Sequence, residues 1–135
     1  MIKIQLSVPY WVVLPRVRRE DVKVILNFNQ YHNWNKFKRN EIKQQFTEMM
    51  EDTLVGCPKL SHVNEIQYTL YAGDARCCDT NNYIVLVDKY FCDSLVHWGV
   101  LPDDNHDYID RTSSAWGGID RNNPRVEITI YGILD

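Results

Sequence analysis

The sequence feature that most constrains the fold is an apolar run in the second half of the chain, bounded by polar and acidic residues at both ends. Residues 83–99 read YIVLVDKYFCDSLVHWG, with DTNN at 79–82 before them and PDDN at 102–105 after them. Thr80, Asn81 or Asn82 can each accept a backbone N–H as a helix N-cap, and Gly99 and Pro102 are residues that end helices. The pattern predicts a helix from Asn82 to Trp98.

This helix is apolar on more than one side. Residues 84–87 are all apolar, and neighbours on a helix are separated by about 100°. The predicted helix therefore needs two apolar surroundings, a sheet and a second surface. Its length of about 17 residues corresponds to roughly 25 Å at 1.5 Å per residue.

The rest of the chain predicts an α+β fold, a small mixed β-sheet covered by two main helices, in one domain over residues 1–135. Apolar and polar residues alternate at 2–8 and 125–131, as in half-buried strands, and residues 22–28 and 62–73 are rich in strand-forming residues. Residues 27–35 predict a loop, and a second helix is expected from Asn35 to Val55, followed by Gly56 and Pro58. Gly117-Gly118 and residues 122–124 are turn signals.

Charge is divided unevenly along the chain. Residues 1–47 contain nine Lys and Arg against three Asp and Glu, whereas residues 48–135 contain six against fifteen. A basic half can follow a phosphate backbone while an acidic half holds metal ions, although such segregation also occurs in proteins that bind neither. The first turns of the second helix contain Lys36, Lys38, Arg39 and Lys43, which either form a solvated face or contact phosphates.

Other patterns narrow the class of protein. No apolar run reaches the roughly 20 residues of a membrane span, and the start of the chain lacks a signal-peptide pattern, so we expect a cytoplasmic protein without membrane contact. The four cysteines, Cys57, Cys77, Cys78 and Cys92, contain no C-x2-C pair and are expected to be reduced structural thiols. No P-loop, G-x-S-x-G or H-E-x-x-H motif is present.

The acidic residues at the two ends of the 83–99 run have two interpretations. Asp79 and the sequence PDDN are common in helix caps and turns. Clustered carboxylates are also the oxygen ligands that Mg²⁺ prefers, and Mg²⁺ supports phosphoryl chemistry.

An ordered set of residues across this region resembles the RusA family of Holliday-junction resolvases, whose pattern is D-x-D-N, a Lys on a helix, D-A-L, a Gly and D-D. The matching positions are Asp79, Asn81-Asn82, Lys89, Asp93-Ser94-Leu95, Gly99 and Asp103-Asp104. The similarity is tight over about 79–105 and looser over residues 26–43 and 117–130. Asn81 stands where the family has its second aspartate, which keeps an oxygen ligand but removes a charge.

The resemblance implies an intertwined homodimer that acts as a Mg²⁺-dependent endonuclease, with Mn²⁺ as an alternative metal, and places paired symmetric nicks in four-way DNA junctions. Asp79 and Asp104 would be the principal metal ligands, assisted by Asn81 and Asp103, and activated water would attack the phosphorus. Lys89 would offset charge on the phosphate, or alternatively be a solvated residue paired with Asp93. The implied DNA-backbone contacts are Asn29, Tyr31, Lys36, Lys38 and Arg39, with Tyr31 and Trp34 available to stack on bases.

The helix length adds a condition to this interpretation. At roughly 25 Å, the helix holds Asp79 and Asp104 of one chain too far apart to share an ion. We therefore expect two antiparallel copies of the helix, so that Asp79 of one chain meets Asp103 and Asp104 of the other, with the surplus apolar face as the dimer seam.

Two other functions remain open from the sequence. One is a non-catalytic DNA- or protein-binding dimer whose metal site has decayed at Asn81. The other is a nuclease that acts on other branched or flap DNA. The sequence does not distinguish a phage or prophage origin from a cellular one.

Overall fold

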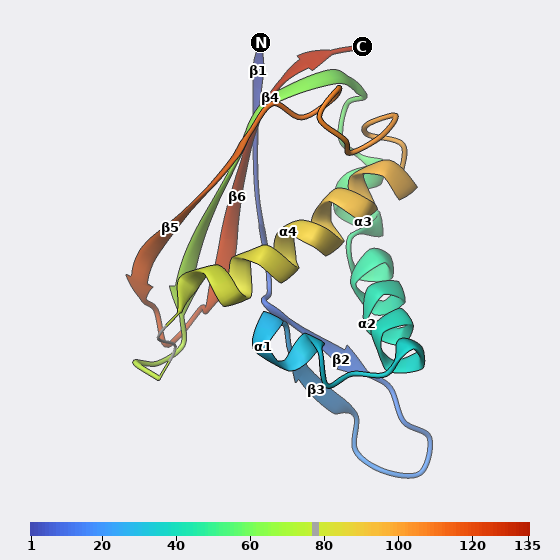
Figure 1. Cartoon of the computed structure of the whole chain (residues 1–135), viewed down its shortest axis with the longest axis vertical. Coiled ribbons are helices and arrows are strands. Elements are labelled where there is room, and N and C mark those ends of the chain that lie inside the picture. Colours follow the sequence, from blue (N-terminus) through green and yellow to red (C-terminus); the bar gives the residue numbers. More distant parts are fainter. Residues whose placement is uncertain (77–78) are drawn as a thin grey trace.

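The computed structural model describes residues 1–76 and 79–135 and has the predicted α+β class (Figure 1). Its elements, in chain order, are β1 (Ile2–Val8), β2 (Trp11–Leu14), β3 (Val22–Ile25), α1 (Phe28–Tyr31), α2 (Lys36–Met49), α3 (Glu51–Val55), β4 (Leu60–Ala72), α4 (Thr80–His97), β5 (Thr112–Ile119) and β6 (Arg125–Leu134).

Four of the strands form one mixed sheet in the order β1-β6-β4-β5. β6 is antiparallel to both β1 and β4, whereas β5 runs parallel to β4. The two central strands alternate buried and more exposed residues, and their buried side chains include Ile66, Tyr68, Ile128 and Ile130. β2 and β3 form a separate antiparallel hairpin.

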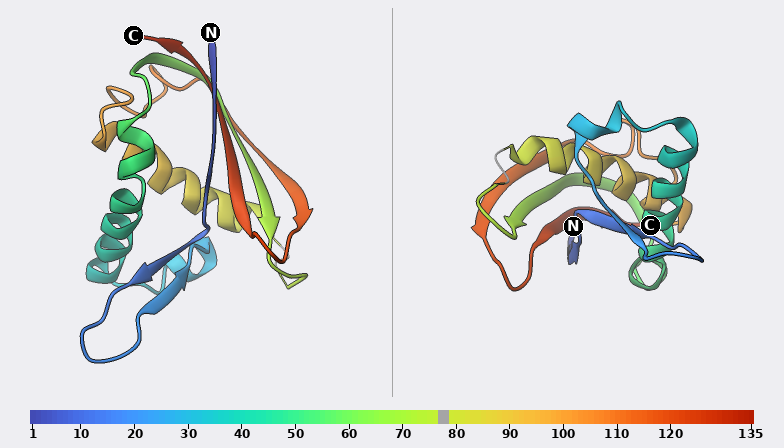
Figure 2. Two further views of the ribbon diagram at one scale, coloured as in Figure 1. Left: turned by 180° about the vertical axis from the view of Figure 1, so that it is seen from behind. Right: turned by 90° about the horizontal axis from the view of Figure 1, so that it is seen from below.

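Helix α4 lies between the sheet and α2 (Figures 1 and 2). On the sheet side, the ring of Phe91 meets that of Tyr68 edge to face at 6.3 Å between centroids. On the other side, Tyr90 packs against Phe46 of α2 at 6.0 Å. The indole N–H of Trp98, the residue after α4, donates to the carbonyl of Thr47 at 2.8 Å.

The second apolar surrounding of α4 is therefore provided within the same chain. Of the apolar side chains of this helix, Ile84, Leu86, Val87, Tyr90, Phe91, Cys92 and Leu95 are buried. Val85 is 48% exposed. The expectation that α4 leaves a broad apolar face for a dimer seam is wrong, because α2 and the sheet cover most of that surface. The second main helix, α2, has its main contacts with α4 and β2, and thus covers the sheet only indirectly.

Several local predictions are corrected by the structure. The segment predicted as a helix from Asn35 to Val55 is divided into α2 and α3 at Met50, whose backbone has φ −85° and ψ −5°. The polar stretch predicted as a loop contains the one-turn helix α1, capped by the side chain of Asn27. The strand β2, whose residues Val12 and Leu14 are buried, was not expected.

The Gly117-Gly118 pair lies within a strand and is not a turn. The register of β5 against β4 shifts here, because Leu70 is opposite Trp116 whereas Tyr71 is opposite Gly118. Gly117 is therefore the extra residue of a β-bulge. A Cβ atom at Gly117 would lie 2.7 Å from the ring of Tyr71, and Gly118 has a φ of +121°, so both positions favour glycine.

Cys57 and Cys92 are free thiols, as expected. The other two residues in that prediction, Cys77 and Cys78, lie outside the described residues.

Candidate functional site

Asp79 lies at the N-terminus of α4 and is its N-cap. Its Oδ1 accepts a hydrogen bond from the backbone N–H of Asn81 at 3.1 Å, which confirms the helix-cap interpretation of Asp79; the other cap candidates, Thr80, Asn81 and Asn82, lie inside the helix. The Oδ1 of Asn81 accepts in turn from the hydroxyl of Ser114 on β5 at 3.1 Å. Both Asp79 and Asn81 are exposed. The side-chain oxygen of Asn81 is thus already engaged with β5.

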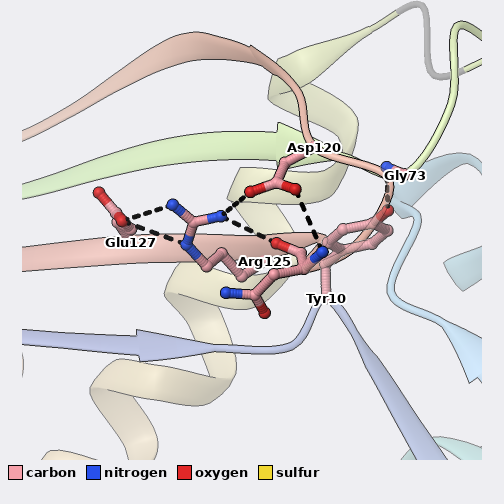
Figure 3. A network of polar contacts seen from close by, with 6 residues as sticks. Tyr10, Gly73, Asp120, Arg125 and Glu127 are labelled. Atoms are coloured by element: carbon pink, nitrogen blue, oxygen red, sulfur yellow. Dashed lines mark hydrogen bonds and ion pairs between the residues drawn. The ribbon is translucent and has the colours of Figure 1, made fainter.

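A network of polar contacts fixes the end of the sheet from which the chain leaves β4 toward Asp79 (Figure 3). The guanidinium of Arg125 donates to Asp120 at 2.9 Å and to Glu127 at 2.8 Å. Next to it, the N–H of Gly73 donates to the hydroxyl of Tyr10 at 3.1 Å. Sequence reasoning missed these residues because they come from four separate segments, with no spacing pattern that connects them.

The other two predicted acidic ligands, Asp103 and Asp104, follow the C-terminus of α4. The Oδ1 of Asp103 accepts from the N–H of Asp104 at 2.7 Å, and its Oδ2 accepts from the Asn105 side chain at 3.1 Å. Partial burial, followed by the nearby carboxylate of Asp93, raises the pKa of Asp104 above its usual value. A bound cation would relieve this repulsion.

The predicted metal ligands do not form one site within a single chain. Asp79 precedes α4 and Asp103-Asp104 follow it, and this helix has 18 residues, which corresponds to roughly 27 Å. Among residues 1–76 and 79–135, no group of three or more His, Cys, Asp or Glu side chains is arranged to hold a metal ion. The side-chain oxygens of the predicted ligands, Asp79, Asn81, Asp103 and Asp104, are of the type that Mg²⁺ prefers. Within a single copy of the chain, however, these residues lie too far apart to bind one ion together.

The structure does bring together four of the residues predicted to act on DNA. A surface pocket between α1, α2 and α4 is lined by Tyr31, Lys36, Arg39 and Lys89, together with Lys43 and Asp93. Lys89 does not pair with Asp93, the alternative considered from the sequence. The carboxylate of Asp93 lies 3.5 Å from the ammonium of Lys43 instead.

The remaining predicted DNA contacts lie outside the lining of this pocket. Asn29 is exposed on α1, where its N–H donates to the side chain of Asn27. Lys38 is exposed, with its ammonium 5.9 Å from the centre of the Trp34 ring. Trp34 itself is only 7% exposed. It is therefore a core residue, and the expectation that it stacks on exposed bases is wrong.

Tyr31 is half-buried and its ring is already in contact with neighbours. The guanidinium carbon of Arg39 lies 4.1 Å from the ring centre, and Phe28 stacks on the ring at 5.8 Å. Arg39 also donates to the carbonyl oxygen of Tyr31 through Nε and Nη2, at 3.1 and 2.9 Å. These contacts hold Arg39 in place and leave Tyr31 little free surface for a base.

Two further residues that line the pocket, Asn40 and Tyr90, were missed by sequence reasoning. Tyr90 has a side-chain oxygen that is buried without a hydrogen-bond partner among the described residues. Its sequence context, within an apolar run, predicted only a core position. The signal that distinguishes it, an unpaired hydroxyl beside a cluster of cations, exists only in three dimensions.

Comparison with family models and with curated proteins found no match to this chain. Over the part of the chain that the structure describes, no helix combines the length and apolar character needed to cross a membrane.

Proposed function

We propose that this protein is a RusA-like endonuclease that resolves four-way DNA junctions by paired symmetric nicks in the presence of Mg²⁺ or Mn²⁺. The observation that best supports the proposal is the basic pocket, in which Lys89 lies beside Tyr31, Lys36 and Arg39. These residues come from separate parts of the sequence. The pocket also adjoins the acidic residues that follow α4, because Asp93 lines the pocket and is near enough to Asp104 to raise its pKa.

The proposal requires a dimer with metal ligands from both chains. The separation of Asp79 from Asp103-Asp104 by the full length of α4 agrees with two antiparallel copies that each contribute one end of the helix. When bound, Mg²⁺ would act as a Lewis acid on a phosphate oxygen and lower the pKa of a coordinated water. Lys89 would offset negative charge on the phosphate.

Surface that a second chain could cover is available near the N-terminus of α4. β5 is at the edge of the sheet, with its backbone unpaired on one side. Trp116 and Ile119 on this strand are each 47% exposed, and Val85 on α4 is 48% exposed. These residues support an intertwined RusA-like dimer in place of the broad α4 seam expected from the sequence.

The test is cleavage of a synthetic four-way junction with Mg²⁺ or Mn²⁺. We expect paired nicks from the unmodified protein and a loss of roughly 100-fold or more with Asp104→Asn, since removing one group that stabilises the transition state costs about 10²–10³ in rate. Asp107→Asn, which removes another carboxylate from the same loop, is the matched control and should keep full activity. Cleavage that survives Asp104→Asn would contradict the assignment.

One observation favours a second function, a DNA- or protein-binding dimer without catalysis. The side-chain oxygen of Asn81 accepts a hydrogen bond from Ser114 and lacks the charge of a carboxylate. Junction binding without cleavage in either metal, together with cleavage gained by Asn81→Asp, would identify a decayed metal site. Flap and forked substrates in the same assay separate junction resolution from a broader nuclease activity.

A further inference from the structure

The basic pocket between α1, α2 and α4 has an excess of positive charge that the protein itself does not neutralise. Four cationic residues, Lys36, Arg39, Lys43 and Lys89, line it with one carboxylate, Asp93. Its volume is about 270 Å³, slightly below the roughly 300–1,000 Å³ of pockets that enclose drug-sized ligands. The pocket therefore suits a small charged group more than a whole organic ligand.

The cations are held in different ways. Arg39 is fixed by its two hydrogen bonds to the carbonyl of Tyr31, which leave its charge uncompensated. Lys43 lies 3.5 Å from the carboxylate of Asp93. Among the described residues, no carboxylate lies within ion-pair distance of Lys36 or Lys89, so both ammonium groups are available to an anion.

Tyr90 adds a feature that is independent of charge. Its side chain is 2% exposed, and the hydroxyl has no hydrogen-bond partner in the part of the chain that the structure describes. A buried polar group without a partner is costly and uncommon in folded proteins. Burial raises its pKa to about 12, so the hydroxyl keeps its proton at neutral pH and can donate.

We propose that this pocket binds one phosphodiester group of a DNA strand, with the Tyr90 hydroxyl donating to a phosphate oxygen and the surrounding cations attracting its negative charge. The two non-bridging oxygens of a phosphodiester share one negative charge and can accept hydrogen bonds from donors on different elements. The choice of DNA as the source rests on the function proposed above. The binding itself needs no metal.

Asp93 competes with the phosphate. Its carboxylate holds Lys43 in the free protein and repels an incoming anion, so phosphate binding requires Lys43 to exchange partners. Removal of this charge by Asp93→Asn should therefore strengthen DNA binding several-fold, because Lys43 is released and the repulsion disappears.

The experiment measures binding of a fluorescent single-stranded oligonucleotide and a four-way junction by anisotropy, in EDTA and over a range of salt. We expect Tyr90→Phe to weaken binding about 10-fold, the effect of losing one hydrogen bond to a charged group. Lys36→Ala and Lys89→Ala should each reduce the slope of log K against log salt for the single strand by about 0.7. Tyr131→Phe and Lys59→Ala, both outside the pocket, are the matched controls and should change neither quantity.

The results separate this proposal from its competitors. Equal DNA binding by Tyr90→Phe and the unmodified protein, or weaker binding by Asp93→Asn, would overturn it. If inorganic phosphate shifts the amide resonances of residues 89–90 while the pocket variants leave DNA binding unchanged, the pocket is a site for free phosphate and the proposal is wrong. Because binding is measured in EDTA, a failure of metal-dependent cleavage leaves this test intact. Cleavage that is unaffected by Tyr90→Phe would count against the pocket alone.

Discussion

Two buried tyrosines, Tyr68 on the sheet side of α4 and Tyr90 on the side of α4 that faces α2, differ in whether their hydroxyl groups have a hydrogen-bond partner. Tyr68, on β4, is 1% exposed, and its hydroxyl donates to the carboxylate of Asp88 and lies 3.9 Å from the thiol of Cys92. Tyr90, within α4, is 2% exposed, and its hydroxyl has no partner among the described residues. The first hydroxyl is satisfied by the fold and the second is not. The comparison shows which buried hydroxyl the fold satisfies and which one it leaves without a partner, as the proposed phosphate site requires.

Burial affects the titration of both groups in the same direction. It raises the pKa of Tyr68 well above the usual value of a tyrosine and raises that of Tyr90 to about 12. Burial and the adjacent Asp88 also raise the pKa of the Cys92 thiol. Both tyrosines therefore remain neutral donors near pH 7, and the difference between them lies in their partners and not in their protonation.

The largest effect on stability is expected for Tyr68→Phe. This variant keeps the packing against Phe91 but leaves the half-buried Asp88 carboxylate without its donor from β4, which should lower the free energy of unfolding by about 1.5–3 kcal/mol. Urea denaturation measures the change, with Tyr131→Phe as a control that touches no such carboxylate. If the two variants were equally stable, the hydrogen bond to Asp88 would not be structural.

Tyr90→Phe should behave in the opposite way at neutral pH, with stability unchanged or increased by up to about 1 kcal/mol, because it removes a buried hydroxyl that has no partner. Below about pH 10, the effect of this substitution on stability should not depend on pH, because Tyr90 is neutral in both the folded and the unfolded state. Since the folded pKa is raised, the stabilisation associated with neutral Tyr90 is complete below the unfolded value near 10 and is lost as pH rises toward 12.

Urea midpoints at pH 8, 10 and 11 for both proteins test this pH dependence. The stability of the unmodified protein relative to Tyr90→Phe should fall across the series. A constant difference would show that Tyr90 does not titrate as its environment implies, and a large loss of stability at pH 8 would mean that its hydroxyl has a partner.

The longer helices and strands could be predicted from the sequence, whereas the shortest elements could not. The helix predicted from Asn82 to Trp98 and the strands predicted at 2–8, 62–73 and 125–131 follow from apolar periodicity and turn residues. They correspond to α4, which begins two residues earlier at Thr80 and ends at His97, and to β1, β4 and β6. The short elements β2 and α1 were missed, because four-residue segments have too few positions for a period to emerge. The two glycines of β5 were misread because a bulge and a turn demand the same residue.

Residues of the candidate site could be predicted where the type of side chain identifies them, but not where their role depends on their position in the fold. Lys36, Arg39 and Lys89 were selected by type and by the family pattern, and the fold brings them into one pocket. Trp34 was misjudged because its burial depends on tertiary contacts, among them those with Tyr31 of α1 and Lys38 of α2. The proposed role of Tyr90 depends on a hydroxyl that has no partner in three dimensions. The burial of α4 depends on its packing against α2. Neither feature can be recognised from a local sequence pattern.

Asp104, like the two tyrosines, has a pKa that its surroundings raise, and Asp104→Asn is expected to give the smallest change in stability. The pKa of Asp104 is raised by burial and by Asp93, so its charge is unfavourable in the folded state at neutral pH. A raised folded pKa contributes stability only while the group is protonated, and this contribution is lost as pH rises through the folded pKa. Asparagine removes the charge, so the variant should be slightly more stable than the unmodified protein at pH 7.

Because Asp104 is exposed, solvent and salt screen the repulsion, and we expect an increase below about 0.5 kcal/mol. The difference should disappear below about pH 3.9, where an aspartate is protonated in the folded and unfolded states alike. Thermal unfolding at pH 3 and pH 7 measures it, with Asp107→Asn as the matched control. A variant that is more stable yet fails to cleave junctions would show that Asp104 is retained for its charge in the site and at a cost to the fold. A less stable variant would instead show that the carboxylate is needed to hold the turn after α4, and its loss of activity would then say nothing about metal binding.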